Sequence, residues 1–273
     1  MKIVVLAESF SEQMGYATNF YPKALAEQGH EVHIITTNTQ PYFSSPDYKS
    51  IFEKFIGPGI VSCSVKPWKG TTLHRLPYKL WPRRTVGIKG LMKTIIDLKP
   101  DIVHCMGLAT ELNYEVALLK PFMPFKYFFE CHIHASVFPP FLVKVKTPER
   151  WLYWHAYRPL TGKMINAAAE KCWAISEDAG EIARDFFGID ERKIALRSLG
   201  TDVSMFKPWY DKDLNERDKF RQQLGFNKND IVCIYTGRNQ EGKDPLILAR
   251  AIDALVKQGQ PYRAIFIGDG AED

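Results

Sequence analysis

The sequence predicts an α/β protein whose parallel sheets are covered by helices, and three observations support this prediction. Short runs of consecutive apolar residues, typical of strands buried on both faces, recur along the chain. Segments with helical spacing of apolar residues lie between these runs. Glycine or proline follows many of the segments, as expected where helices and strands end. This alternation builds βαβ units, and βαβ units assemble into a parallel sheet.

The N-terminal part of the chain contains most of the predicted elements. Apolar runs predict strands at residues 2–7, 32–35, 60–65, 72–76, 102–106, 127–131, 172–175 and 194–196. Helical spacing predicts helices at residues 19–28, 86–98, 110–120, 149–169 and 177–187. Gly29 suits a left-handed helix end, and Ser176 suits a helix N-cap. Residues 36–59 are predicted to be a surface insertion near the carboxyl edge of the sheet, and Pro139 and Pro140 mark a second loop.

The remaining chain predicts a linker and a smaller second domain. Residues 199–213 are polar and charged, which is typical of an interdomain linker. A short helix is expected at residues 219–224. We therefore divide the chain into domains 1–205 and 206–273.

A strand-to-helix junction in the second domain predicts an anion site. The apolar run at residues 231–235 predicts a strand buried on both faces. Asp244 suits an N-cap, and Pro245 suits the first helical position. A helix that begins beyond a strand directs free N–H groups and a partial positive charge at a ligand. Arg238 and Lys243 add two full charges there, which favours a diphosphate ligand, although ordinary surface cations are the alternative interpretation.

Length and composition are those of an ordinary globular protein. The chain has 273 residues, of which 45% are hydrophobic and 25% are charged, with a formal net charge of +5. No apolar run approaches the roughly 20 residues that span a bilayer, and Met1 leads directly into a strand without a signal peptide. Five scattered cysteines without Cys-x-x-Cys spacing indicate reduced, buried thiols. We expect a cytoplasmic protein.

Cations gather between residues 66 and 99, where Asp97 is the single acid. They are Lys66, Lys69, Arg75, Lys79, Arg83, Arg84, Lys89, Lys93 and Lys99. Aromatic residues among these cations favour peripheral contact with an anionic membrane, here the inner membrane face. A merely solvated basic face explains the pattern equally well. Nucleic acid is disfavoured as a partner because no nucleic-acid-binding motif accompanies the cations.

Candidate site residues collect where the predicted strands end, because ligands of such sheets bind at the carboxyl edge. They are Gly15, Gly107, His132, Gly237 and Gly268. His132 and His134 follow an apolar strand, a position that suits either an active-site histidine or a hydrogen-bonded structural one. A zinc site that also uses Cys131 is rejected, since alternate residues of a strand end point in opposite directions and no second ligand pair is visible.

Three other functional motifs are rejected because the surrounding sequence does not fit them. The Asp-x-Asp pattern at residues 211–213 lies in the polar linker and does not follow a buried strand, so it indicates solvated charge. Residues 8–15 lack the glycine triplet of the dinucleotide fingerprint, which argues against a dehydrogenase. Ser176 and Ser198 have no nucleophile elbow, which argues against a hydrolase triad.

Several segments are each a weak indication of a protein family, but their order along the chain makes the set specific. They are the loop at Gly15, residues 29–32 (Gly-His-Glu-Val), 99–104 (Lys-Pro-Asp-Ile-Val-His), 173–177 (Trp-Ala-Ile-Ser-Glu), 200–208, Gly237-Arg238 with Lys243, and 266–270 (Phe-Ile-Gly-Asp-Gly). In this order they resemble the family 4 glycosyltransferases, retaining enzymes of the GT-B architecture, which has two Rossmann-like domains. The resemblance implies a complete N-terminal acceptor-side domain and only the first βαβ part of the C-terminal nucleotide-sugar-binding domain.

The resemblance also implies roles for individual residues. The implied donor diphosphate-binding residues are Arg238, Lys243, Gly237 and Gly15. Their fixed charge would stabilise the departing nucleoside diphosphate, so neither a metal nor another cofactor is expected. His132 is the implied catalytic residue, in contact with the transferred sugar. The implied sugar or acceptor cleft contains His134, Tyr16 and Gly268.

The implied reaction moves a sugar, with retention at the anomeric carbon, from a UDP or GDP sugar to a glycan, lipid or other acceptor. A non-catalytic binding or partner subunit derived from a glycosyltransferase is the alternative.

The sequence departs from the family at three places. Met14-Gly15 stands where the family has a glycine pair, and Asp244 stands where a glycine is common. The family's two glutamates, separated by seven residues, are not reached before Asp273. We therefore expect a truncated chain, a fragment or an interrupted gene, without full turnover. A C-terminal piece of roughly 60 residues buries little surface, so its strands should leave an open apolar edge.

Overall fold

The structure is a computed structural model that describes residues 1–80, 86–134, 147–206, 214–239 and 241–270. The chain separates into two compact units. The N-terminal unit comprises Met1–Tyr48 and Phe52–Thr201, and the C-terminal unit comprises Lys49–Ile51 and Asp202–Asp273. The division after Thr201 lies near the predicted domain boundary at residue 205.

An eight-stranded sheet forms the centre of the N-terminal unit, in the order β10-β9-β8-β7-β1-β2-β4-β3. Its strands are β1 Lys2–Ala7, β2 Glu31–Thr37, β3 Ser64–Trp68, β4 Thr71–Leu76, β7 Ile102–Cys105, β8 Lys126–Cys131, β9 Lys171–Ala174 and β10 Ile194–Leu196. Neighbouring strands are parallel, except that β3 pairs with β4 in the antiparallel direction. The predicted fold class is therefore confirmed for this unit.

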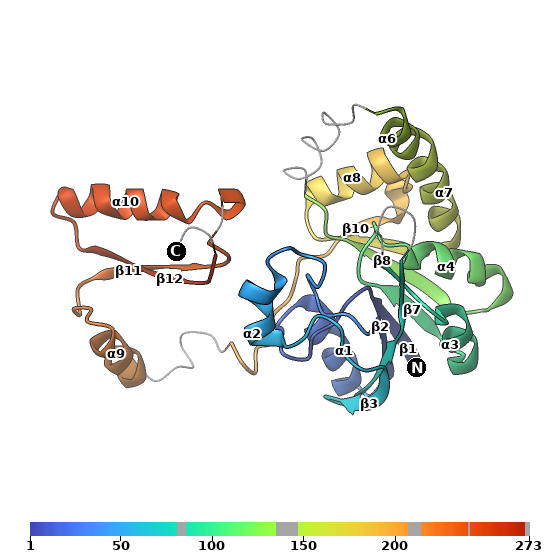
Figure 1. Cartoon of the computed structure of the whole chain (residues 1–273), viewed down its shortest axis with the longest axis horizontal. Coiled ribbons are helices and arrows are strands. Elements are labelled where there is room, and N and C mark those ends of the chain that lie inside the picture. Colours follow the sequence, from blue (N-terminus) through green and yellow to red (C-terminus); the bar gives the residue numbers. More distant parts are fainter. Residues whose placement is uncertain (81–85, 135–146, 207–213, 240, 271–273) are drawn as a thin grey trace. The chain divides into compact units, whose positions relative to one another are not determined.

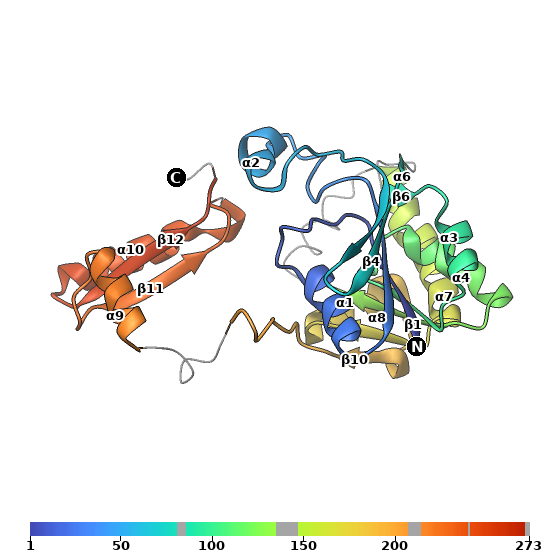
Figure 2. The same cartoon turned by 90° about the horizontal axis from the view of Figure 1, so that it is seen from below.

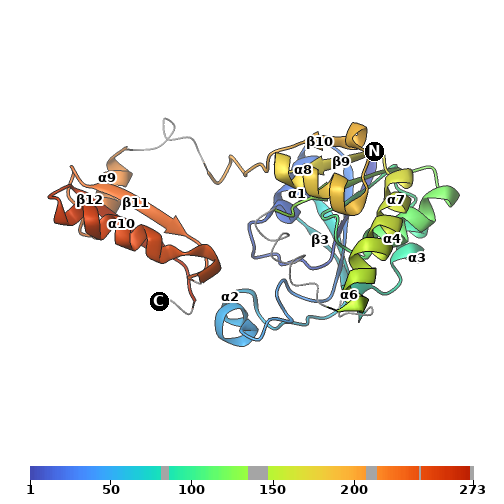
Figure 3. The same cartoon turned by 90° about the horizontal axis from the view of Figure 1, so that it is seen from above.

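Helices cover both faces of this sheet because its central strands are apolar on both sides. On one face Ile3 and Val5 pack against the helix α1, Ala17–Glu27. The opposite face packs against α3 Leu91–Leu98, α4 Leu112–Leu119, α7 Arg158–Ala168 and α8 Glu177–Phe187. Figures 1 and 2 show α1 on the other side of the sheet from α3, α4 and α7, and Figure 3 gives the same arrangement from above.

The ends of several helices follow the predicted chemistry. Gly29 and Gly188 have φ angles of +83° and +68°, so both follow their helices in the left-handed region that glycine favours. Ser176 immediately precedes α8, as predicted for an N-cap. Its hydroxyl, however, donates to the Asp178 carboxylate (2.5 Å) and accepts no hydrogen bond from the helix backbone.

The predicted helix at residues 86–98 is wrong in its first part. Val86–Ile88 forms a strand, β6, antiparallel to β5, Tyr78–Leu80. Gly90, with φ of +84°, separates β6 from α3. Ile88 is fully buried in the same core cluster as Leu91, so a strand residue and a helix residue contribute to one apolar pattern. Periodicity alone does not separate these two cases.

Other predicted elements differ in detail. The insertion at residues 36–59 contains a π-helical turn, Tyr48–Phe52, and a short helix α2, Glu53–Ile56, both anchored by buried apolar side chains. The strand predicted at 60–65 begins only at Ser64. The helix predicted at 149–169 consists of α6 Pro148–Leu152, a π-helical segment Tyr153–Tyr157 and α7. The loop at Pro139 and Pro140 lies outside the described residues.

The C-terminal unit contains the helix α9 (Leu214–Gln223), the strand β11 (Ile231–Thr236), the helix α10 (Pro245–Lys257) and the strand β12 (Tyr262–Ile267). The two strands pair in parallel, and α10 packs against β12. The prediction of a strand buried on both faces is wrong in this structure, because Ile231 and Ile234 of β11 are 47% and 60% exposed. A sheet of two strands offers too few neighbours to cover them. Among the described residues, β11 and β12 pair only with each other, so the sheet has the predicted open edge.

Within the described part of the chain, no helix combines the length and the apolar character that crossing a membrane requires.

Candidate active site

A buried carboxylate organises the end of β8. Residues two apart on a strand lie on the same side, so Glu130 and His132 both face the α1 side of the sheet, whereas Cys131 lies in the opposite core cluster. Nε2 of His132 lies 2.5 Å from Oε2 of Glu130. The other oxygen of Glu130 lies 3.0 Å from Nε2 of the buried His104, on the neighbouring strand β7. Glu130 therefore fixes the orientation of the imidazole of His132.

The protein holds this carboxylate ionised. Burial opposes ionisation of Glu130, but the hydrogen bonds with His104 and His132 outweigh it and lower the pKa of Glu130 to about 2. Arg197, just after β10, adds a cation 3.9 Å from Glu130. Because Nε2 of His132 faces this carboxylate, Nδ1 is the ring nitrogen that remains for a ligand.

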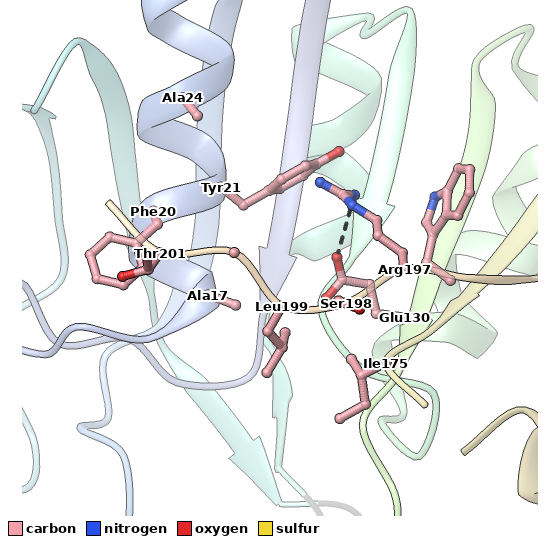
Figure 4. A pocket seen from close by; sticks show the side chains of 12 residues that line it. Ala17, Phe20, Tyr21, Ala24, Glu130, Ile175, Arg197, Ser198, Leu199 and Thr201 are labelled. Carbon is pink, nitrogen blue, oxygen red and sulfur yellow. Dashed lines mark ion pairs between the residues drawn. The ribbon is translucent and has the colours of Figure 1, made fainter. Parts of the chain in front are cut away.

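A cavity of about 170 Å³ lies beside this carboxylate, between the first turns of α1 and the chain after β10. Figure 4 shows Arg197 directed toward Glu130, with the Tyr21 ring beside its guanidinium group. The guanidinium carbon of Arg197 lies 4.6 Å from the Tyr21 ring centroid and 5.9 Å from that of Trp173. Two aromatic rings therefore hold the cation in place at the cavity wall.

The remaining predicted residues of the N-terminal unit border the same carboxyl edge. His134 is half exposed, and its Nδ1 lies 3.4 Å from the Asp178 carboxylate in the first turn of α8. Tyr16 is the N-cap residue of α1. A β-carbon at Gly15 would lie 3.3 Å from the Phe20 ring, so a larger residue would crowd the start of this helix.

A second cavity, of about 260 Å³, lies at the carboxyl end of β1, and Glu8, Tyr16, Tyr42 and Thr110 are among the residues that line it. Burial and the nearby Glu111 raise the pKa of Glu8, Arg158 partly offsets them, and the resulting pKa is about 7. Sequence reasoning missed Glu8, although a carboxylate directly after the apolar run of β1 is a signal that could have found it.

The C-terminal unit contains the predicted diphosphate residues. Gly237 and Arg238 follow β11, and Lys243, which is exposed, lies two residues before Pro245, the first residue of α10. A β-carbon at Gly268 would lie 1.8 Å from the carbonyl oxygen of Gly237, so only glycine permits this close backbone approach. The structure thus brings Gly237 and Gly268 together beside the start of a helix, as expected of an anion site.

Asp244 does not cap α10 as predicted. It occupies the N-cap position, but its side chain makes no cap hydrogen bond, and its backbone has φ of +46°. Glycine adopts this left-handed conformation more readily than aspartate. The geometry therefore explains why a glycine suits this position.

The cations of residues 66–99 do not form one continuous exposed patch. Arg75 is buried and donates to the Glu12 carboxylate (2.6 Å), which also pairs with Lys66. Lys79 pairs with Glu115 (2.9 Å). These acids are distant in sequence, so the local charge pattern could not reveal them. Arg83 and Arg84 lie outside the described residues.

Among the described residues, no group of three or more histidine, cysteine, aspartate or glutamate side chains is arranged to hold a metal ion.

Comparison with known proteins identifies the family. The family model described as Glycosyltransferase Family 4 matches residues 23–205. The chain belongs to glycosyltransferase family 4.

Two curated relatives of this family 4 chain are D-inositol 3-phosphate glycosyltransferases. The one from Rhodococcus erythropolis (strain PR4 / NBRC 100887) is 24% identical over 247 residues, which cover 89% of this chain and 51% of the relative. The one from Corynebacterium glutamicum (strain R) is 24% identical over 232 residues, which cover 85% and 51%. The chain thus spans about half the length of the curated relatives that it matches.

Solved structures confirm the predicted fold of the family 4 chain. Anabaena Alr3699/HepE in complex with UDP has a TM-score of 0.58 at 17% identity, and the match covers 99% of this chain and 62% of that one. A glycosyltransferase from Rickettsia africae ESF-5 has a TM-score of 0.60 at 16% identity, with 98% and 60% covered. These neighbours are GT-B glycosyltransferases, as the sequence resemblance implied.

Proposed function

We propose that the protein containing this family 4 chain transfers a sugar from a nucleoside diphosphate sugar to an acceptor. The observation that carries the proposal is the family match over residues 23–205. Relatives named as glycosyltransferases and the HepE structure with UDP-glucose support it. The alternative, a non-catalytic subunit, has no comparable support.

In this proposal the C-terminal unit holds the donor. Arg238 and Lys243 bind the diphosphate at the N-terminal end of α10, and the loop at Gly237 approaches the donor closely. Negative charge grows on the leaving phosphate in an oxocarbenium-like transition state, where fixed cations are most effective. The proposed reaction is retaining and needs no metal ion.

The N-terminal unit supplies the sugar-facing groups. His132, oriented by Glu130, contacts the transferred sugar through its Nδ1 side. His134 and Tyr16 are the further sugar- or acceptor-facing residues of this unit in the proposal.

The donor site is tested by calorimetry with UDP, GDP and ADP on the protein as its gene encodes it in full. Arg238→Ala and Lys243→Ala should each raise the Kd of the nucleotide that binds by about tenfold or more, since each removes a charge-assisted hydrogen bond. Lys257→Ala, at the far end of α10, is the matched control and should leave the Kd unchanged. Absence of nucleotide binding, or an unchanged Kd in both site variants, would refute the proposal.

We also propose that the protein contacts the cytoplasmic membrane face peripherally, through the α3 side of the N-terminal unit. Lys93 and Lys99 are exposed there, and Ile96, Lys99 and Phe122 line one surface hollow. Phe122 is 83% exposed. An apolar ring beside cations suits an anionic bilayer surface.

Phe122→Ser should weaken co-sedimentation with anionic vesicles by about tenfold, because one buried aromatic side chain contributes about 1.5–3 kcal/mol. Phe55→Ser, at a residue 61% exposed on α2, is the control. An equal loss of vesicle binding in both variants, or binding that does not depend on the charge of the lipid, would refute the proposed membrane contact.

A further inference from the structure

We infer that the cavity at the carboxyl end of β1 binds a neutral, hydroxyl-rich ring, a glycosyl or cyclitol acceptor, and excludes phosphorylated ones. This inference rests on the proposed function, because it names the class of acceptor for that reaction. It departs from the curated relatives, whose name specifies an inositol phosphate.

The size and lining of the cavity match one sugar ring. Its volume is about 260 Å³, and most of its lining residues have side chains that can form hydrogen bonds. They include Glu8, Ser11, Tyr16, Asn19, Tyr42 and Thr110. Hydroxyl and amide groups both donate and accept, and an ionised carboxylate accepts, so the wall can pair with ring hydroxyls.

Two tyrosines from separate loops form an aromatic rim. The hydroxyls of Tyr16 and Tyr42 lie 3.0 Å apart, and both side chains remain about half exposed. Tyr42 has φ of +64°, a conformation that tyrosine rarely adopts, and its ring stacks on Phe52 with centroids 4.6 Å apart. Backbone strain of this kind persists only where the surrounding structure holds the residue in place, and such residues cluster at ligand-binding sites. The rim gives an apolar surface for the face of a ring.

The charges around the cavity disfavour an anionic ligand. Glu8 lines the cavity, and none of the lysine, arginine or histidine residues of the described chain does so. Arg158, a buried cation 4.0 Å from Glu111, lowers the pKa of Glu8 less than burial and Glu111 raise it. The start of α1 contributes only a partial positive charge, and the N–H groups of Asn19 and Phe20 already donate to the Tyr16 carbonyl. Above pH 7, where the Glu8 carboxyl is ionised, its full negative charge therefore repels a phosphate more strongly than these partial charges attract it.

The test compares the affinities of two ligands for the same variant. A fraction of unfolded protein weakens both apparent affinities equally, so their ratio does not change. Binding of myo-inositol, a panel of methyl glycosides and inositol 3-phosphate is measured at pH 8 by NMR titration of the full chain, with labelled tyrosines as reporters. At pH 8 the Glu8 carboxyl is ionised, since its pKa is about 7. In the unmodified protein, inositol 3-phosphate should bind at least about tenfold more weakly than the neutral ring that binds best.

Glu8→Gln should reduce this preference to about threefold or less, because the amide keeps the size of the side chain and one acceptor oxygen and removes the charge. Glu27→Gln, at an exposed carboxylate at the other end of α1, should keep the original ratio. Tyr42→Phe should weaken the neutral ligand without changing the ratio.

Either of two results would overturn the inference: inositol 3-phosphate binding as tightly as the neutral rings, or no neutral ring perturbing the signals of Tyr16 and Tyr42. Nucleotide binding at Arg238 and Lys243 is measured separately and needs no acceptor. Intact nucleotide binding without ring binding would refute the acceptor class alone, whereas ring binding without nucleotide binding would refute the transferase.

Discussion

Gly162→Ala is expected to lower the free energy of unfolding of the N-terminal unit by about 3 kcal/mol. Gly162 lies in α7 where this helix crosses the end of α8, and a β-carbon there would lie 1.5 Å from the carbonyl oxygen of Phe187. That atom belongs to the backbone, so no side-chain rotation relieves the clash and the two helices must separate. Separation would loosen the buried contacts of Ile165 and Phe187 in the main core cluster.

Urea denaturation followed by far-ultraviolet circular dichroism measures this effect. Gly200→Ala is the matched control, because a β-carbon at Gly200 meets nothing within 4 Å and no unusual φ is required there. The control should change the free energy of unfolding by less than about 0.5 kcal/mol. If the two variants were equally stable, α7 and α8 would not pack as closely as the structure has them.

Local sequence chemistry predicted much of the fold. The strand Lys2–Ala7 coincides with its predicted bounds, and Gly29 ends α1 as expected, because an apolar run and a glycine that follows a helix both act over a few residues. The wrong prediction of a helix at Val86–Ile88 has a non-local cause. There the pairing with Tyr78–Leu80 decides the structure, and such pairing is a tertiary effect that spacing does not encode.

The candidate site was less accessible to sequence reasoning for the same reason. His132 was found from its place after an apolar strand, but the carboxylate that orients it was not singled out. Glu130 gains its role from His104 and Arg197, which are 26 residues before it and 67 residues after it in the chain. Parallel pairing of β7 with β8 and of β9 with β10 brings these side chains together. A charged residue inside an apolar strand, two positions from a histidine, was the only local sign.

Glu130→Gln is expected to lower the free energy of unfolding by about 3 kcal/mol at pH 7. Hydrogen bonds with His104 and His132 hold the pKa of Glu130 at about 2 in the folded protein, against an ordinary value of 4.5, in spite of burial. Each unit of difference corresponds to about 1.4 kcal/mol, and the Glu130 side chain is only 8% exposed, so solvent screens little of it. The neutral amide of the variant cannot provide this stabilisation.

The pH dependence distinguishes this charge effect from simple loss of packing. Because the folded-state pKa is lowered, the stabilisation is fully present above pH 4.5 and is lost as the pH falls toward 2. Urea denaturation at pH 7 and at pH 3 should therefore show the difference between Glu130→Gln and the unmodified protein falling to less than half. Glu181→Gln, an exposed position on α8, should show no difference at either pH. If the difference in free energy of unfolding between Glu130→Gln and the unmodified protein stayed constant with pH, Glu130 would stabilise the fold through its shape alone. The conclusion that an ionised Glu130 orients His132 would then be wrong.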